Sequence, residues 1–253
     1  MKAVFLAPVR ALSLLVALSG PTSSMSAESR IESVVRVTAN PVQYGRTDFS
    51  VVLTADWQDP FDSQDVSLDL VLALPTGRRV VLPAFHVRGP SGRSSVWSAR
   101  FAAAEAGTYR GAFVLRDGED SCESAPVAFD VAPSASKGFL RTAGQWLLRF
   151  DNGEPFRGVG ENFCWESVDN DSSGFGKELN ENSRFNFEYM FGKLAANGGN
   201  FTRIWMCAWG LPIEWKSIHP DTRAYASDDA HFNPSGVQAT DRMVEALERS
   251  GVY

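Results

Sequence analysis

The hydrophobic pattern of this chain changes its period at residues 133–136, a connector of proline, serine and alanine. Before the connector, apolar and polar residues alternate: Phe49, Val51 and Leu53 share one face of a run in which Ser50 lies on the other. This period of two indicates β-strands with one buried face. After the connector, apolar residues recur every three or four positions in two runs, which indicates amphipathic helices. The change predicts two domains that are built differently.

The first predicted domain covers residues 31–133 and consists of short β-forming runs separated by turn-forming residues. This arrangement is typical of an antiparallel sandwich of the immunoglobulin type. Between Glu105 and Tyr109, a turn leads into a strand, which suits a closing hairpin or a tyrosine corner. We interpret the aromatic residues of this domain as core rather than as sugar-binding groups. The predicted strands are residues 34–38, 49–57, 66–74, 79–87, 96–101, 109–115 and 127–131.

The second predicted domain covers residues 137–253 and alternates strands with helices. Apolar residues of 187–195 recur at helical spacing, and an Asn-Gly-Gly stop signal follows them. Residues 201–207 form a nearly continuous apolar strand, a long loop follows, and Asn-Pro at 233–234 starts a second helix. The order strand, helix, strand, helix predicts a parallel sheet. The residues expected to face inward from the second helix are Val237, Met243, Val244 and Leu247.

Residues 1–27 have the pattern of a secretory signal peptide. Lys2 and Arg10 are basic, residues 11–18 (ALSLLVAL) are apolar, and small residues follow. The apolar run is too short to cross about 30 Å of hydrocarbon at about 1.5 Å per residue, although an uncleaved anchor is the alternative. We expect a secreted or periplasmic protein with no membrane span after signal cleavage.

The composition argues against several other classes of partner. The chain has 24 Lys and Arg against 30 Asp and Glu, a net charge of -6, and no basic run, so we do not expect it to bind nucleic acid. Cys122, Cys164 and Cys207 form no CxxC motif, and we expect neither a metal site nor a cofactor. Cys164 and Cys207 are either a disulfide or two buried thiols.

Polar and aromatic residues gather where two of the predicted strands end, a position where parallel sheets bind their ligands. Indole rings stack on pyranose faces, while carboxylate, amide and guanidinium groups pair with hydroxyls. The candidate saccharide-binding residues are Glu161, Asn162, Trp165, Trp205 and Trp209. The alternative is that the tryptophans fill the end of the core and that Arg203 pairs with a buried carboxylate.

Two segments of the second domain resemble a known family. Residues 137–165 (KGFLRTAGQWLLRFDNGEPFRGVGENFCW) and 194–209 (LAANGGNFTRIWMCAW) resemble the opening of a clan A (β/α)8 glycoside hydrolase of the family 5-like cellulase group. Bacterial members of that group often carry an immunoglobulin-like domain directly before the barrel. The resemblance implies a multidomain chain, with an immunoglobulin-like all-β sandwich followed by the first βα units of an incomplete (β/α)8 TIM barrel. It further implies that Arg203 hydrogen-bonds the catalytic nucleophile and that Asn162 and Trp165 face the substrate.

The family mechanism would be retaining hydrolysis of O-glycosyl bonds in a β-linked polysaccharide. It uses two glutamates about 5 to 5.5 Å apart, which the resemblance places at the ends of the fourth and seventh barrel strands. Residues 137–253 are about half the roughly 250 residues of a whole barrel. We therefore expect an amino-terminal fragment that contacts polysaccharide or oligosaccharide but lacks the catalytic glutamates.

Three alternatives stay open beside this hypothesis. Glu161 and Glu166 could form the catalytic pair, but two residues five apart at a strand end have no fixed short separation, and Glu161 better suits a sugar hydroxyl or Arg203. The chain could be a secreted, non-catalytic carbohydrate-binding or adhesion protein. It could also be an incomplete chain that aggregates, because half a barrel exposes a strand edge and apolar faces.

Overall fold

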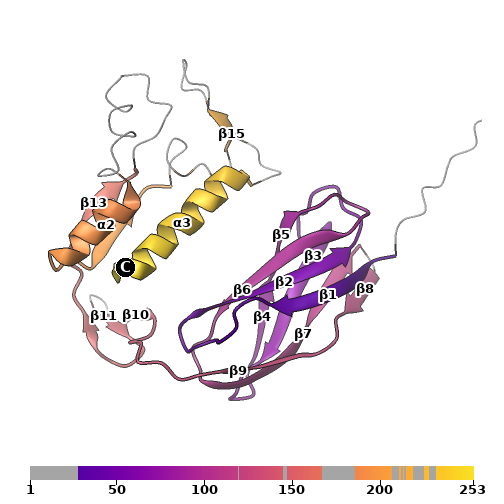
Figure 1. Cartoon of the computed structure of the whole chain (residues 1–253), viewed down its shortest axis with the longest axis horizontal. Helices are drawn as coiled ribbons and strands as arrows, with labels where there is room; N and C mark the ends of the chain where they lie inside the picture. The colour runs from indigo at the N-terminus through magenta and orange to yellow at the C-terminus, as the bar shows by residue number, and fades with distance from the viewer. Residues whose placement is uncertain are drawn as a thin grey trace, which may run out of the picture.

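The computed structural model describes residues 28–118, 120–144, 147–166, 186–206, 211, 213, 215–218, 225–227 and 232–253 (Figure 1). A β-sandwich is followed in the chain by a second group of elements that contains both described helices. The predicted signal peptide at residues 1–27 lies outside the described residues, as do Trp209 and Cys207. Neither described helix combines the length and the apolar character of a membrane-spanning segment.

Two antiparallel sheets form the β-sandwich. The first has the strand order β1-β2-β6-β5, and the second has the order β4-β3-β7-β8, with β9 also paired to β7. The strands are β1 (Arg30–Arg36), β2 (Arg46–Thr54), β3 (Val66–Ala73), β4 (Arg79–Pro83), β5 (Phe85–Arg88), β6 (Ser95–Ala102), β7 (Gly107–Asp117), β8 (Asp120–Glu123) and β9 (Val127–Val131).

Burial alternates along the sandwich strands because successive side chains point to opposite faces of a sheet. In β3, Leu68, Leu70 and Leu72 are at most 1% exposed, and the residues between them are half-buried. The leucines pack in one core with aromatic residues of β2, β6, β7 and β9. At one end of this core, the Tyr109 hydroxyl donates a hydrogen bond to the Glu105 carbonyl oxygen at 2.9 Å, which is the contact of a tyrosine corner.

The predicted strands of the sandwich are present, with two differences. Residues 79–87, predicted as one strand, are divided between β4, which pairs with β3, and β5, which pairs with β6 of the other sheet. The chain changes sheets at Ala84, whose backbone N–H donates to the Leu68 carbonyl oxygen at 2.7 Å. Strand β8 is absent from the prediction because its sequence, Asp-Ser-Cys-Glu, has no apolar alternation.

The second group contains three small sheets and two described helices. One sheet is an antiparallel meander of β10, β11 and β12, another pairs β13 with β14, and the third is the hairpin β15–β16, where the sequence predicts only a loop. The elements are β10 (Leu140–Thr142), β11 (Leu148–Phe150), β12 (Pro155–Phe156), β13 (Gly160–Cys164), α2 (Phe187–Ala196), β14 (Phe201–Ile204), β15 (Trp215–Ile218), β16 (Tyr225–Ser227) and α3 (Pro234–Ser250).

Both helices begin with asparagine caps. The Asn186 side chain accepts a hydrogen bond from the Tyr189 backbone N–H at 3.0 Å, and Asn233 accepts one from the Gly236 N–H at 3.4 Å. Helix α2 ends at the predicted Asn-Gly-Gly signal, where Gly198 has a φ of 81°. The predicted positions of the two helices are therefore confirmed.

A second core lies between α2, α3 and one face of the β13–β14 pair. Its buried members are Phe187, Phe191, Leu211, Met243 and Ala246. Phe163 and Ile204 of the two strands pack against it, as does the predicted inward residue Leu247. Val244 was expected to face inward, but it is 44% exposed, because it lies about 100° around the helix from its neighbour Met243.

The predicted fold class, an immunoglobulin-like sandwich followed by the first βα units of a (β/α)8 barrel, is wrong. Among the described residues, parallel strand pairing is confined to β13 with β14 and one isolated bridge, and every other strand pair is antiparallel. The fold is mostly β, with α2 and α3 as its only described helices. The expectation failed because a strand–helix–strand pattern specifies one local pairing and leaves open how the flanking segments pair.

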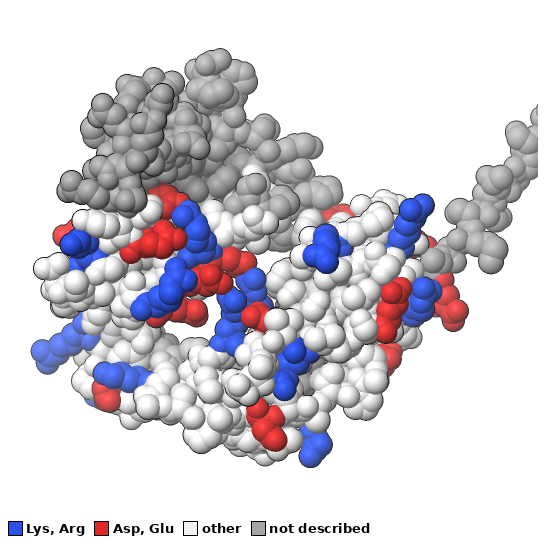
Figure 2. Space-filling model, in the orientation of Figure 1, with Lys and Arg blue, Asp and Glu red and all other residues white. Residues whose placement is uncertain are grey.

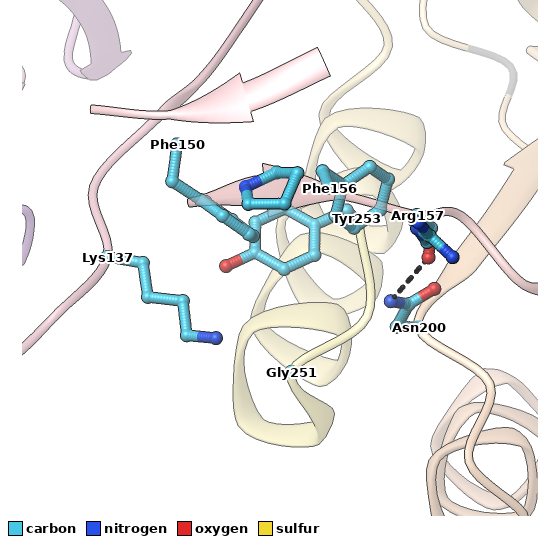
Figure 3. A pocket seen from close by; sticks show the side chains of 8 residues that line it. Lys137, Phe150, Phe156, Arg157, Asn200, Gly251 and Tyr253 are labelled. Carbon is cyan, nitrogen blue, oxygen red and sulfur yellow. Dashed lines mark hydrogen bonds between the residues drawn. The ribbon is translucent and has the colours of Figure 1, made fainter. Parts of the chain in front are cut away.

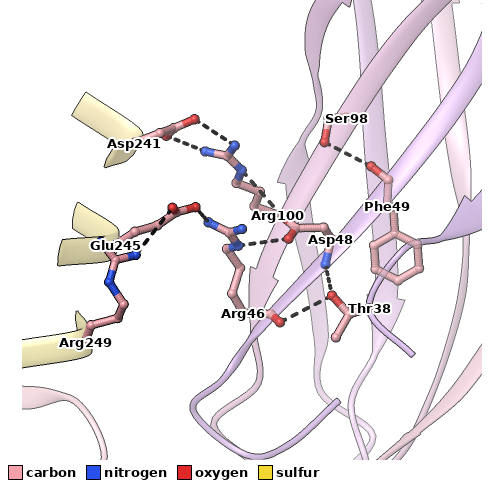
Figure 4. A network of polar contacts seen from close by, with 9 residues as sticks. All are labelled: Thr38, Arg46, Asp48, Phe49, Ser98, Arg100, Asp241, Glu245 and Arg249. Atoms are coloured by element: carbon pink, nitrogen blue, oxygen red, sulfur yellow. Dashed lines mark hydrogen bonds and ion pairs between the residues drawn. The ribbon is translucent and has the colours of Figure 1, made fainter. Parts of the chain in front are cut away.

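Ion pairs join α3 to the sandwich (Figure 4). The two terminal guanidinium nitrogens of Arg100 in β6 donate to the two Asp241 carboxylate oxygens, at 2.6 and 2.8 Å. Arg46 in β2 binds Glu245 at 2.9 Å and Asp48 at 2.8 Å. The hydrogen bonds to Asp241 and Glu245 raise the pKa of Arg100 and of Arg46, respectively.

The remaining contacts between the two parts combine charge with aromatic packing. Basic and acidic side chains lie side by side where α3 faces the sandwich (Figure 2). Phe232, just before α3, packs edge-on against Phe61 of the sandwich with ring centroids 5.3 Å apart. These contacts give α3 a defined position against the β2–β6 sheet.

Candidate functional site

The candidate site is built on the parallel pair β13–β14. In the register of this pair, Asn162 lies opposite Arg203 and Glu161 lies opposite Thr202. Phe163, the next residue after Asn162, packs into the helix-covered core. Because side chains alternate along a strand, Asn162 and Arg203 lie on the opposite face, away from the helices, and both are exposed.

An irregularity interrupts the pairing of β13 just before Trp165. The register shifts between Asn162 and Cys164, and Cys164 has a φ of 55°, a conformation uncommon for a residue other than glycine. The Trp205 backbone N–H donates to the Cys164 carbonyl oxygen at 2.7 Å. The two strands are therefore still linked where Trp165 and Trp205 leave them.

Trp165 and Trp205 form an exposed aromatic pair, called here the Trp pair. Their ring centroids are 5.5 Å apart and their planes are inclined by 52°. The two residues are 37% and 40% exposed. The Arg203 guanidinium lies 5.7 Å from the Trp205 ring centroid, within the range of a cation–π contact. The site thus offers two indole faces beside a cation and, across the strand register, an amide.

Glu161 does not share a face with Arg203. It is exposed, and it alternates with Asn162, so its side chain starts from the helix-covered side of the strand. Its carbonyl oxygen accepts a hydrogen bond from the Thr202 hydroxyl at 2.8 Å. The register therefore does not favour the expected pairing of Glu161 with Arg203.

Both carboxylate oxygens of Glu166 are occupied. One accepts a hydrogen bond from the Phe187 backbone N–H at the start of α2, at 3.1 Å, and the other pairs with the Arg242 guanidinium of α3. Arg242 also lies 3.5 Å from Glu188 of α2. Glu166 therefore links the end of β13 to both helices, which disfavours it as half of a catalytic pair. Sequence reasoning missed Arg242, since a single exposed arginine in a helix gives no signal.

A separate pocket lies at the other end of β14 (Figure 3). It has a volume of about 470 Å³ and is lined by Lys137, Phe150, Pro155, Phe156, Arg157, Asn200, Gly251 and Tyr253. Phe150, Phe156 and Tyr253 pack edge to face with centroids 5.4 to 5.6 Å apart. Asn200 precedes β14 and Trp205 follows it, so these two residues, one in the pocket and one in the Trp pair, are about 16 Å apart along the chain.

Two polar side chains of this pocket, those of Asn200 and Lys137, are paired within the protein. The Asn200 amide donates to the Arg157 carbonyl oxygen at 3.0 Å and accepts from the Val159 N–H at 2.8 Å. Lys137 pairs with Glu154 at 2.8 Å, and this contact raises the pKa of Lys137 and lowers that of Glu154. These contacts stabilise the local structure, so the pocket is not our candidate site.

The structure thus brings together some of the predicted site residues. Trp165, Trp205 and Arg203 are in contact, Asn162 lies beside Arg203, and Glu161 starts from the other face. Trp209 and Cys207 lie outside the described residues, and Cys164 has a free thiol. In the described part of the chain, no group of three or more His, Cys, Asp or Glu residues is placed to hold a metal.

Comparison with known proteins gives a structural likeness only. No protein-family model matches the chain, and no curated protein matches it. The chain is similar to the crystal structure of a "putative glycoside hydrolase" from Bacteroides vulgatus ATCC 8482, with a TM-score of 0.52 and 16% identity. That likeness covers 84% of this chain and 40% of the other, so this chain spans less than half the length of the structure it matches. At this identity the likeness shows a shared fold.

Two further solved structures are less similar, and their likeness is too low to indicate a shared fold. One is the Pseudomonas fluorescens alkylpurine DNA glycosylase AlkC bound to DNA, with a TM-score of 0.31 and 15% identity over 42% of this chain and 31% of the other. The other is BslA, a bacterial hydrophobin, with a TM-score of 0.22 and 14% identity over 42% of this chain and 99% of the other.

Proposed function

We propose that this chain is the saccharide-binding part of a glycoside hydrolase and that the Trp pair is its binding platform. The observation that carries the proposal is the exposed pair of indole rings beside Arg203 at the carboxyl end of a parallel strand pair. The structural likeness to a chain described as a glycoside hydrolase supports it. The sequence resemblance in residues 137–165 and 194–209 points to the same class.

The chemistry of the platform suits a pyranose. The C–H faces of the sugar pack on indole rings, while its hydroxyls need hydrogen-bond partners at the edge. Arg203 supplies donors only, and Asn162 supplies both a donor and an acceptor. The two rings are inclined by 52° and do not form one flat surface. The platform therefore suits two successive sugar units of a bent chain better than a flat chain.

We further propose a substrate, a mechanism and a cellular location for the intact enzyme. We assign it a β-linked polysaccharide substrate, a retaining mechanism and export directed by residues 1–27, with domains divided at residues 133–136. A retaining mechanism needs two carboxylates about 5 to 5.5 Å apart. Since Glu166 is held by Arg242 and α2, we assign binding rather than bond cleavage to the described residues.

The occupied Glu166 also favours a second candidate, a non-catalytic carbohydrate-binding protein. In that case the Trp pair would bind saccharide without turnover. The release of reducing sugar from a polysaccharide by the purified chain would exclude this candidate. Binding without such release would favour it for this polypeptide.

Affinity electrophoresis of the full chain in gels that contain cellulose derivatives, xylan or mannan tests the proposal. We expect one polysaccharide to retard the chain, and we expect Trp165→Ala to weaken that binding about tenfold, or about 1.4 kcal/mol. Tyr189→Ala is the matched control, because Tyr189 is a similarly exposed aromatic residue, 38%, on the outside of α2. Equal retardation of all three proteins, or none in any gel, would refute the proposal.

A further inference from the structure

We infer that Arg242 is a positioning residue that acts through Glu166 to hold Trp165 beside Trp205. Its relevance to saccharide binding rests on the proposed function, whereas its effect on the geometry of the Trp pair does not. The sequence around Arg242 contains no pattern that indicates this role. Folding brings Arg242 to Glu166 at the end of β13.

Trp165 is held through the residues on either side of it. On the amino-terminal side, the Cys164 carbonyl oxygen accepts a hydrogen bond from the Trp205 N–H at 2.7 Å. On the carboxyl-terminal side, the Glu166 carboxylate is bound by the Phe187 N–H and by Arg242. With both neighbours fixed, the backbone direction of Trp165 is set.

The two ligands of Glu166 are not equivalent. The Phe187 N–H belongs to the first turn of α2, where a carboxylate is favoured by free backbone donors and by the helix dipole. Arg242 supplies a full charge from α3, and the Glu166 side chain is only 14% exposed. A charge-assisted contact of this kind fixes the carboxylate in one direction more strongly than a neutral hydrogen bond does. Removal of Arg242 would leave the Glu166 carboxylate, among the described residues, with the Phe187 N–H alone and therefore less firmly fixed.

The residue before Arg242 provides a matched control. Asp241 lies on the same turn of α3 but points to the sandwich, where it pairs with Arg100. Asp241→Asn therefore weakens the attachment of α3 to the sandwich without touching Glu166. A comparison of the two variants separates the Glu166 contact from a general loosening of α3.

Circular dichroism of the full chain reads the Trp pair directly, because two indoles 5.5 Å apart couple their electronic transitions and give a signed couplet. Trp57 and Trp97 of the sandwich, with centroids 5.8 Å apart, give a couplet of their own. The signal of the Trp pair in each protein is therefore taken as the difference between the spectrum of that protein and the spectrum of the same protein with Trp205→Phe. A thermal melt of each variant confirms that it is folded.

We expect Arg242→Gln and Glu166→Gln to lose most of the Trp-pair couplet, Arg242→Lys to retain part of it, and Asp241→Asn to retain it all. Retention of the couplet in Arg242→Gln would overturn the inference. So would an equal loss in Asp241→Asn, since the effect would then belong to α3 as a whole.

Saccharide binding forms a second and separable arm of the test. We expect Arg242→Gln to weaken binding about threefold to tenfold, the range of a contact worth about 1 kcal/mol. If the unaltered chain binds no saccharide while the couplet still depends on Arg242, the proposed function fails and the positioning role stands. If saccharide binds and Arg242→Gln changes neither couplet nor affinity, the positioning role fails alone.

Discussion

The ion pair between Arg100 and Asp241 allows a quantitative test of how the sandwich is attached to α3. The pair is bidentate, with contacts of 2.6 and 2.8 Å, and the side chains are 38% and 34% exposed. Two unit charges about 4 Å apart attract by about 1 kcal/mol in water and about 4 kcal/mol at an effective dielectric constant of 20. Desolvation and the ordering of two side chains offset part of this attraction. We therefore expect a net coupling of about 1 kcal/mol.

A double-mutant cycle with Arg100→Gln and Asp241→Asn measures this coupling. Urea unfolding of the four proteins gives the free energy of unfolding of each, and the cycle isolates the pairwise contribution. Because the pair is partly exposed, the coupling should fall in about 1 M salt, where the screening length is about 3 Å. A coupling near zero at low salt would refute the attachment, and a coupling unchanged by salt would refute its electrostatic origin.

Two further predictions concern the sandwich. Glu32→Gln should lower stability at neutral pH and have no effect at strongly acidic pH. Hydrogen bonds from Thr54 and Ser94 lower the pKa of Glu32 from 4.5, so its contribution is present above pH 4.5 and disappears as the pH falls through the lowered pKa. Acid unfolding curves of the two proteins that differ at low pH would contradict this. Gly111→Ala should destabilise the sandwich by several kcal/mol, because the added Cβ would lie 1.8 Å from the Val71 carbonyl oxygen in the adjacent strand β3. Thermal melts of the two proteins measure this effect. An unchanged melting midpoint would contradict the prediction and show that the two strands can move apart.

The sandwich strands could be predicted because burial and sequence share one period. In β2, Phe49, Val51 and Leu53 are each at most 1% exposed, and the alternation that marks them in the sequence is also what packs them in the core. Strand β8 and the hairpin β15–β16 could not be found in this way, because strands of three or four residues are too short to show an alternating apolar pattern and are held by pairing with neighbours. Tertiary contacts decide such segments, and a local pattern does not contain them.

The predicted architecture of the second part rested on extending one strand–helix–strand unit to a whole barrel. The signals of the two helices, the apolar spacing over residues 187–195 and Asn-Pro at 233–234, are local, and the structure confirms both helices. Whether one strand–helix–strand unit continues into a barrel depends on which segments pair next, and the preceding strands β10, β11 and β12 form a separate antiparallel meander. The resemblance to a barrel enzyme supplied that expectation, and strand pairing among the described residues overturned it.

The partners of the site residues were the least predictable part, and α3 shows why. A helix turns about 100° per residue, so consecutive residues of α3 reach three different neighbours: Asp241 pairs with the sandwich, Arg242 with Glu166, and Met243 with the core of α2. The helical period identifies Met243 as buried, because burial needs only an apolar face. It does not identify the partners of Asp241 and Arg242, because a charge on an exposed face has no partner until the surrounding elements are placed. The positioning of Trp165 therefore follows from where α3 packs, and a sequence pattern that marks the tryptophans as candidates cannot show what holds them.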